Sequence, residues 1–421
     1  MISLLRKITP SFLLGWYHFA LAVLGAVLYR FPSKKLKVIG VTGTNGKSTV
    51  VEFITKIFEE AGIPVASQSS IRFKIKDKEQ PNAYKMTMPG RFFIQRFLRR
   101  AKDAGCKFAI LEVTSEGIKQ YRHKFIDFEA AVFTNLSPEH IEAHGGFEKY
   151  KAAKGKLFQA VKNIHIINID DGNADYFLRF RAKKKYTYGL ERGDINNKDI
   201  QFNLGVPGDF NIYNALAAIC VGLSQGVGLE TCKRAVEKVK GIPGRMEEVM
   251  SEPFRVFVDY AFTPNALRKV YETLRNSKFD PAPLQKGGAK LICVLGACGG
   301  GRDKWKRPVL GGIAAKYCDK VIITNEDPYD ENPMEIIGQV AVGAEKISMN
   351  QPNQHKSVVQ KILDRREAIS EALKLAEPQD TVIITGKGCE PWICLKGGKK
   401  IPWNEKEVVR EEFKKLKLNT Q

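Results

Sequence analysis

Apolar residues in this chain occur mainly in short β-branched runs, each followed by a polar, glycine-containing loop and then by an amphipathic stretch. Parallel strands buried on both faces, with functional residues at their carboxyl ends, have this appearance. The pattern therefore predicts an α/β fold built on doubly wound sheets. The expected strands are 37–39, 108–113, 130–135, 165–170, 255–260, 290–296, 320–324 and 381–386, and the expected helices include 50–58 and 211–223.

The pattern breaks around Pro243, which has Gly241 and Gly244 close by. Proline and glycine together mark a loop, and this stretch is the best hinge in the chain. We expect two nucleotide-fold-like α/β domains that can close over substrates. The predicted division is an apolar N-terminal segment 1–35, a central domain 36–242 and a C-terminal domain 243–421.

The most informative local feature is residues 40–49, Gly-Val-Thr-Gly-Thr-Asn-Gly-Lys-Ser-Thr, between an expected strand and an expected helix. Such a turn directs backbone N–H groups and a helix N-terminus at phosphate oxygens. Lys47 can then reach the β- and γ-phosphates, and the Ser48 hydroxyl can bind Mg²⁺. An ordinary glycine-rich turn does not need Lys-Ser at these positions, so the sequence predicts ATP binding.

Composition limits the kinds of partner that the protein can have, but it does not indicate a particular activity. The 421 residues are 43% hydrophobic and 27% charged, with a formal net charge of +21. A basic surface attracts phosphates, nucleic acids and anionic lipids alike, but no zinc-finger or aromatic RNA-binding motif accompanies it, so we expect no nucleic-acid partner. The eight cysteines form no C-x-x-C pair, which favours a reducing cytosol without a disulfide scaffold.

The segment 12–28 is apolar and has cations on both sides, at Arg6 and Lys7 and again from Arg30 to Lys37. About 17 apolar residues lie at the lower limit for crossing a bilayer. Aromatic residues near its ends suit a helix on an anionic leaflet, so contact with the membrane through 12–31 is one interpretation. A helix buried against the central domain is the other.

Polar residues cluster after the expected strands of the central domain. Glu112 ends one strand, His140 follows the next, and Lys154 comes shortly afterwards. A carboxylate and an imidazole near a triphosphate are plausible Mg²⁺ ligands, although each could instead only form hydrogen bonds in a polar cleft. Together with the phosphate-binding turn, they favour a metal site.

On these residues the chain resembles the Mur ligases, ATP-dependent amide-forming enzymes of peptidoglycan synthesis, and most of all the MurE type, which adds the third stem-peptide residue. The resemblance covers roughly 36–412. The segments that carry it are 42–49, 134–140, 144–145, 152–154, 210–217, 243–247, 258–261, 299–308 and 386–390.

The resemblance implies roles for individual residues. The phosphate-binding turn, Gly43, Thr44, Asn45, Gly46, Lys47, Ser48 and Thr49, would hold ATP together with Asn135, Asn214, Arg245 and Asp259. Ser48, Glu112, His140 and Lys154 would hold Mg²⁺, with Lys154 as a carbamate; Lys47, Glu112, His140 and Lys154 form the catalytic set. Thr87, Thr114, Gln120 and Arg122 would bind the muramyl-peptide donor, and Arg302, Asp327, Gly386 and Glu390 the incoming amino acid.

The mechanism implied is a two-step ligation in which the donor carboxylate takes the γ-phosphoryl of ATP and the amine of the amino acid then displaces phosphate. MurE enzymes that use diaminopimelate carry an Asp-Asn-Pro-Arg loop, whose arginine binds the distal carboxylate. Here the loop reads Glu326-Asp327-Pro328-Tyr329, and a tyrosine cannot form that bidentate pair. We therefore expect a diamino acid such as lysine, whose distal ammonium suits the acidic residues of 326–331, unless these form only a solvated loop.

Other departures concern substrate contacts and the front of the chain. Phe262, Cys389 and Glu116 stand where the family usually has histidine. Only some 35 residues precede the first strand, where typical MurE enzymes carry a uridine-binding domain. Two hypotheses follow: the donor binds without that domain, or it is linked to a lipid and is met at the membrane. We expect a monomer in the cytoplasm, and contact through 12–31 would place it at the inner face of the membrane.

Three alternatives stay open from sequence. A folylpolyglutamate synthase also lacks the uridine domain, but its usual Gly-Lys-Gly-Ser turn ending is absent here. A cyanophycin or polyglutamate synthase is a more distant possibility. A non-catalytic nucleotide-binding scaffold of wall assembly is the third, and the joint presence of Lys47, Glu112, His140 and Lys154 argues against it.

Overall fold

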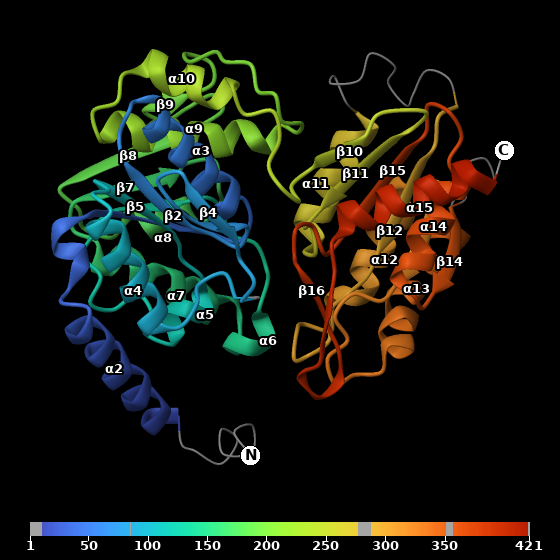
Figure 1. Ribbon diagram of the computed structural model, residues 1–421, viewed down its shortest axis with the longest axis horizontal. Coiled ribbons are helices and arrows are strands. Elements are labelled where there is room, and N and C mark those ends of the chain that lie inside the picture. The colour runs from blue at the N-terminus through green and yellow to red at the C-terminus, as the bar shows by residue number, and fades with distance from the viewer. Residues whose placement is uncertain (1–10, 85, 277–287, 351–356, 420–421) are drawn as a thin grey trace. The chain divides into compact units, whose positions relative to one another are not determined.

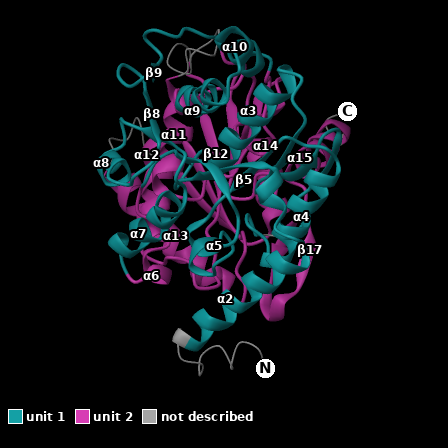
Figure 2. Cartoon of the chain, turned by 90° about the vertical axis from the view of Figure 1, so that its left-hand side faces the viewer, with its two compact units in different colours: residues 1–136, 146–203, 212–238 teal, residues 137–145, 204–211, 239–421 magenta. Residues whose placement is uncertain are grey.

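The computed structural model describes residues 11–84, 86–276, 288–350 and 357–419. Within these ranges the chain forms two compact units (Figure 2). Unit 1 comprises residues 1–136, 146–203 and 212–238, and unit 2 comprises residues 137–145, 204–211 and 239–421. The expected α/β architecture is confirmed, because each unit is built on a largely parallel sheet with helices packed on it (Figure 1).

Unit 1 contains a nine-stranded sheet in the order β4-β3-β2-β5-β1-β6-β7-β8-β9. Strand β3 is antiparallel to both of its neighbours, β2 and β4, and all other neighbouring strands are parallel. The strands are β1 (Lys37–Thr42), β2 (Val65–Gln68), β3 (Arg72–Ile75), β4 (Lys78–Pro81), β5 (Phe108–Glu112), β6 (Phe128–Phe133), β7 (Ile164–Asn168), β8 (Lys184–Gly189) and β9 (Ile195–Asn196).

Helices cover both faces of this sheet because its central strands are apolar on both sides (Figure 1). One face packs on α3, which α10 contacts in turn, and the other packs on α4, α7 and α8. The helices of this part of the chain are α2 (Ser11–Leu28), α3 (Lys47–Glu60), α4 (Arg91–Asp103), α5 (Ser115–Lys119), α7 (Phe147–Ala160), α8 (Ala174–Leu178), α9 (Phe210–Ser224) and α10 (Leu229–Glu237), with a 3₁₀ turn η1 (Pro32–Lys35).

Unit 2 contains a six-stranded sheet in the order β10-β11-β15-β12-β13-β14, in which only β10 is antiparallel to its neighbour. Helices α11, α12 and α13 pack on one face, and α14 and α15 on the other. Its elements are α6 (Ile141–His144), β10 (Glu247–Met250), β11 (Arg255–Asp259), α11 (Pro264–Arg275), β12 (Leu291–Leu295), α12 (Lys306–Tyr317), β13 (Lys320–Thr324), α13 (Pro333–Met349), β14 (Val358–Ile362), α14 (Arg365–Leu375), β15 (Thr381–Thr385), the hairpin β16 (Trp392–Cys394) and β17 (Lys400–Pro402), the 3₁₀ turn η3 (Lys396–Gly398), and α15 (Glu405–Asn419).

The units divide the chain near 238, close to the hinge expected at Pro243, but two segments differ from the predicted domain boundaries. The loop 137–145 belongs to unit 2, because Asp303 accepts hydrogen bonds from the backbone of Ile141 and Glu142, and Lys306 pairs with Glu139. Segment 204–211 also belongs to unit 2, where Phe210 packs on the core. The contacts of loop 137–145 join residues some 160 positions apart. Domain boundaries drawn as consecutive ranges along the sequence therefore do not capture them.

The N-terminal segment predicted as 1–35 is not separate, since its described part belongs to unit 1; residues 1–10 lie outside the described ranges. Helix α2 packs against α4, with Gly25 close to the backbone of Arg91 and Phe92. Among the described helices, none combines the length and apolar character needed to cross a membrane.

Candidate active site

The expected phosphate-binding turn links β1 to α3 in unit 1. Gly46 precedes the helix with φ +82°, a left-handed conformation that favours glycine. A side chain there would also meet the amide oxygen of Asn214 at 2.3 Å. Lys47 begins the helix, and its ammonium donates to the Thr44 carbonyl oxygen at 2.9 Å. The turn therefore leads directly into a helix N-terminus, which is where a phosphate group can be bound.

The loop after β6 holds the other side of this turn. The Thr44 N–H donates to the Asn135 carbonyl oxygen at 2.8 Å, and the Asn45 N–H donates to the Asn135 side-chain oxygen at 2.9 Å. The Thr134 hydroxyl donates to the Asn45 carbonyl oxygen at 2.7 Å. Asn135 therefore shapes the turn through its backbone and its side chain.

Glu112, at the end of β5, lies beside the start of α3. Its Oε2 accepts from the Ser48 hydroxyl at 2.9 Å and from the Ser70 N–H at 2.8 Å, and its Oε1 lies 3.8 Å from the Lys47 ammonium. The carboxylate is buried, so these contacts replace its hydration. Ser70 has no motif that sequence reasoning could have used, and it was missed for that reason.

Lys154, on α7, reaches the same turn from the other side. Its buried ammonium nitrogen donates to the Gly43 carbonyl oxygen at 2.7 Å and lies 4.6 Å from the ring centre of Tyr150. Burial lowers the pKa of the Lys154 amine well below its usual value, and the charge of Lys47 lowers it further. Tyr150, whose hydroxyl lies 3.1 Å from that of Thr44, is a second contact that the sequence did not reveal.

The structure thus brings Lys47, Glu112 and Lys154 of the predicted catalytic set together with Ser48, which was predicted to bind Mg²⁺. His140 lies in unit 2, where its Nδ1 is 3.5 Å from an Arg302 guanidinium nitrogen. Arg245 and Asp259 are also in unit 2: the Arg245 guanidinium lies 4.5 Å from the Tyr260 ring centre, and Asp259 accepts from the Met246 and Ala261 N–H groups. Burial raises the pKa of Asp259.

Residues expected to bind the donor gather around α5 in unit 1. Thr114 caps this helix by accepting from the Gly117 N–H at 3.0 Å. Arg122 donates to the Gln120 side-chain oxygen at 2.7 Å and to the carbonyl oxygen of Met88. Thr87 precedes Met88, and its carbonyl oxygen accepts from the Gln68 side chain. The four predicted donor residues therefore belong to one small region.

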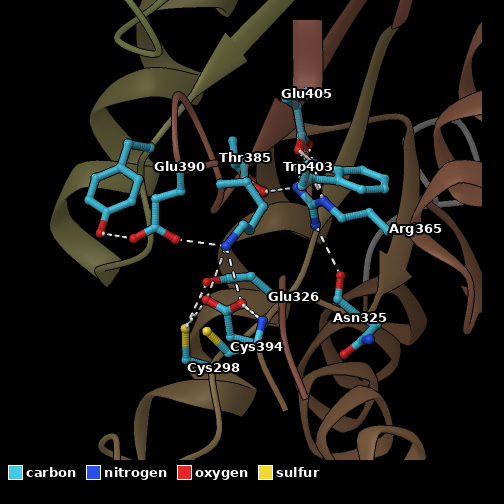
Figure 3. Close-up of polar contacts among 12 residues, drawn as sticks. Cys298, Asn325, Glu326, Arg365, Thr385, Glu390, Cys394, Trp403 and Glu405 are labelled. Atoms are coloured by element: carbon cyan, nitrogen blue, oxygen red, sulfur yellow. Dashed lines mark hydrogen bonds and ion pairs between the residues drawn. The ribbon is translucent and has the colours of Figure 1, made fainter. Parts of the chain in front are cut away.

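In unit 2 the carboxyl ends of β13 and β15 meet in a buried charged cluster (Figure 3). The Lys387 ammonium lies 3.1 Å from Asp327 and 2.7 Å from Glu390, and the Tyr260 hydroxyl donates to Glu390 at 2.9 Å. Asp327 also accepts from the Cys394 N–H at 2.8 Å. Lys387 therefore balances two residues predicted to bind the amino acid, a role that sequence reasoning had not given it despite its place between two glycines.

Glu326 lies beside this cluster, but its contacts differ from those of Asp327 and Glu390, which both pair with Lys387. Its Oε1 accepts from the Cys298 thiol at 2.8 Å, while its buried Oε2 has no hydrogen-bond partner among the described residues. Burial raises the pKa of the Glu326 carboxyl, and nearby Asp327 raises it further. The interpretation of 326–331 as a solvated loop is excluded for Glu326 and Asp327, which are both buried.

One group of possible metal ligands occurs among the described residues: Cys298, Glu326 and Asp327, with ligand atoms within 4.8 Å of one another. Burial raises the pKa of the Cys298 thiol well above its usual value, so it is a neutral donor and not a thiolate ligand. The Lys387 ammonium already lies against Asp327. The chemistry of this group suits a bound cation such as an ammonium better than a metal ion.

Two family models match the chain. The Mur ligase middle domain matches residues 41–222, and the Mur ligase glutamate ligase domain matches residues 244–388. A UDP-N-acetylmuramoyl-L-alanyl-D-glutamate–2,6-diaminopimelate ligase of Syntrophomonas wolfei is 35% identical over 416 residues, covering 93% of this chain and 81% of that protein. A UDP-N-acetylmuramyl-tripeptide synthetase of a Roseiflexus species is 34% identical, covering 94% and 82%.

Solved structures of other ligases are similar to this chain as well. A UDP-N-acetylmuramoyl-L-alanyl-D-glutamate–2,6-diaminopimelate ligase superposes with a TM-score of 0.58 at 29% identity, covering 91% of this chain and 79% of that one. The Mycobacterium tuberculosis folylpolyglutamate synthase superposes with a TM-score of 0.66 at 16% identity, covering 87% and 92%. The second likeness shows a shared fold.

Proposed function

Because this chain belongs to the Mur ligase family of ATP-dependent ligases, we propose that it joins an amino acid to the terminal carboxylate of a muramyl peptide in peptidoglycan precursor synthesis. The observation that carries this proposal is the cluster in unit 1, where Lys47, Ser48, Glu112 and Lys154 surround one glycine turn. Relatives that cover most of the chain are named as ligases of a muramyl dipeptide with 2,6-diaminopimelate, which is the same class of reaction.

The residues beside the turn fit a magnesium ion. A serine hydroxyl and a buried carboxylate lie 2.9 Å apart at Ser48 and Glu112, and oxygen ligands of this kind suit Mg²⁺. We propose that these two residues hold the ion that accompanies ATP, with His140 and a carbamate on Lys154 at a second one. The ion would offset the charge of the phosphoryl group during transfer.

In the first step, transfer of the γ-phosphoryl group, residues of the glycine turn act by positioning ATP. Backbone N–H groups of the turn and the Lys47 ammonium hold the β- and γ-phosphates, so that an oxygen of the donor carboxylate attacks the γ-phosphorus and ADP leaves. The resulting acyl phosphate is then attacked by the amino group of the incoming amino acid. Inorganic phosphate leaves, the amine loses its proton, and an amide bond remains.

We propose that the incoming amino acid is a diamino acid without a distal carboxylate, such as lysine. Tyr329 stands where an arginine would bind that carboxylate, and Lys387 already balances Asp327 and Glu390. The buried Glu326 oxygen remains available to a ligand cation. A screen of amino acids for phosphate release, with a muramyl dipeptide that ends in D-glutamate as donor, tests this: lysine should support turnover, and no acceptor-dependent release with any amino acid would overturn the proposed function.

Replacing Glu326 by glutamine should raise KM for lysine by about 10- to 100-fold, because a hydrogen bond to a charged group contributes about 1.5–3 kcal/mol. KM for ATP should stay unchanged. Asp330→Asn is the matched control, since Asp330 is exposed on the same loop and accepts a hydrogen bond from the Gly397 N–H. An unchanged KM for lysine in Glu326→Gln would remove Glu326 from the acceptor site.

Lys154 should react with carbon dioxide, because its lowered pKa leaves the nitrogen lone pair free to attack carbon, giving a carbamate and a proton. With ¹³C-bicarbonate we expect a carbamate NMR signal in the wild type and none in Lys154→Arg. That variant should lose about 10- to 100-fold in turnover, as metal-supporting groups do. Lys151→Arg, one turn away on α7, is the control; a carbamate signal that persists in Lys154→Arg would contradict the assignment.

The cytoplasm supplies ATP and the precursors that this reaction needs, and we propose that the enzyme works there as a monomer. Thr87, Thr114, Gln120 and Arg122 are proposed to bind the muramyl peptide, since they form one region beside α5. Arg302 and Gly386 are proposed to complete the acceptor site in unit 2, and Asn214, Arg245 and Asp259 to contact the nucleotide.

A further inference from the structure

Helix α2 places its small residues inward and its large apolar residues outward. Ala22 and Ala26 are 2% and 0% exposed, and Gly25 contacts the start of α4. Trp16 and Leu28, by contrast, are 70% and 60% exposed. A helix that only packs on a protein core buries its large apolar residues, so this arrangement is the reverse of the usual one.

Phe19 is 36% exposed, and its ring lies beside those of Tyr121 and Phe125. The other exposed apolar residues form one continuous stripe. At 3.6 residues per turn they fall within an arc of about 120°, and at 1.5 Å per residue the stripe is about 22 Å long. No residue of α2 is charged. The members of the α2 stripe are Leu13, Trp16, Tyr17, Ala20, Leu24, Val27 and Leu28.

Cations border the α2 stripe. Arg30, Lys34, Lys35 and Lys37 follow the helix and are all exposed, and no aspartate or glutamate occurs before Glu52. On α4, the helix against which α2 packs, Arg96 and Arg100 are exposed, and Asp103 is paired with Arg99 and Lys102. The surroundings of the stripe are therefore positively charged.

We propose that α2 docks this protein on an anionic lipid bilayer, lying in the plane of the headgroups with the α2 stripe toward the acyl chains. An apolar helix face with aromatic residues and bordering cations is what such a surface binds. The helix lies on the membrane and does not cross it, in keeping with its length and character. Figure 1 shows α2 extending from the body of unit 1, in keeping with the exposure of Trp16 and Leu28.

Charge favours an anionic lipid leaflet over a second copy of this protein as the partner of the α2 stripe. Basic residues next to a lipid leaflet gain about 1 kcal/mol each from an anionic surface. A second copy of this chain would bring the same net charge of +21 to the interface and would be repelled. The proposal stands independently of the ligase reaction, because α2 contains none of the residues placed at the nucleotide or amino-acid sites.

Flotation of the full-length protein with vesicles tests this. Vesicles of phosphatidylcholine with 30% phosphatidylglycerol (about one anionic lipid in three, chosen to resemble an anionic leaflet) should carry the protein to the top of the gradient, and pure phosphatidylcholine should carry about tenfold less. Raising the salt concentration to about 1 M should release much of it, since that shortens the screening length to about 3 Å. Equal binding to both vesicles, or none to either, would overturn the proposal.

The variant Trp16→Ser/Leu24→Ser/Val27→Ser should lose about tenfold or more of its binding to anionic vesicles. The matched control is Val342→Ser/Met349→Ser, which removes two apolar side chains that are 61% and 74% exposed on α13 of unit 2. Both variants should keep the wild-type melting temperature and ATP affinity, which separates a docking defect from misfolding and from failure of the proposed function. Undiminished flotation of the α2 variant would overturn the proposal, as would a wild-type dimer in light scattering that the α2 variant abolishes.

Discussion

Replacing Lys47 by alanine is expected to reduce acceptor-dependent phosphate release by about 100- to 1,000-fold, the range found when one preorganised donor to a developing charge is removed. The Lys47 ammonium is fixed by the Thr44 carbonyl oxygen at 2.9 Å and lies 3.8 Å from Glu112. It therefore needs little reorganisation to meet the β- and γ-phosphates. Nucleotide affinity should fall as well, because the same contact is made in the ground state.

The measurement is phosphate release with saturating muramyl dipeptide and lysine, together with nucleotide titration by calorimetry. Lys56→Ala is the matched control, since Lys56 lies on the same helix and its ammonium pairs with Glu59 at the surface. That variant should keep wild-type turnover. If Lys47→Ala retained more than a tenth of the activity at an unchanged melting temperature, the glycine turn would not be the catalytic phosphate site.

Replacing Arg365 by methionine is expected to destabilise unit 2 by about 3–5 kcal/mol, the usual result of removing one partner from a buried ion pair. Arg365 and Glu405 are each 1% exposed and 2.6 Å apart (Figure 3). The guanidinium also donates to the carbonyl oxygens of Asn325 and Thr385, so the change leaves three acceptors without this donor. The effect reaches the acceptor site, because Asn325 precedes Glu326.

Urea unfolding followed by tryptophan fluorescence measures this, since Trp305, Trp392 and Trp403 all belong to unit 2. Arg366→Met is the matched control at the next position. Its side chain is 39% exposed and pairs with Glu411 and Glu412, and Glu412 keeps Lys415 as a partner, so the loss should stay below about 1 kcal/mol. Arg365→Met/Glu405→Leu should recover much of the loss, because no buried charge is left alone. Equal midpoints for the two single variants would contradict the assigned role of the buried pair.

Much of the fold and the glycine turn that carries Lys47 could be predicted from local sequence. Strands such as β5 and β13 could be predicted because continuous apolar runs are typical of strands buried on both faces. Residues 43–48 could be assigned because one short segment carries the turn, the helix start and the ammonium. Short or polar strands such as β4 and β9 were missed, since their residues follow neither apolar pattern and depend on neighbouring strands.

The sequence by itself therefore determined the α/β architecture, the phosphate-binding turn and the family, all of which depend on residues adjacent along the chain. Tertiary structure alone decided that Lys154 is buried against Gly43, that the loop of His140 belongs to unit 2, and that α2 turns its large residues outward. It also decided that one Glu326 oxygen has no hydrogen-bond partner within the described part of the chain. Burial and charge balance arise from packing between segments far apart in the chain. The pKa of an amine and the exposed face of a helix are set by those neighbours, which no local pattern contains.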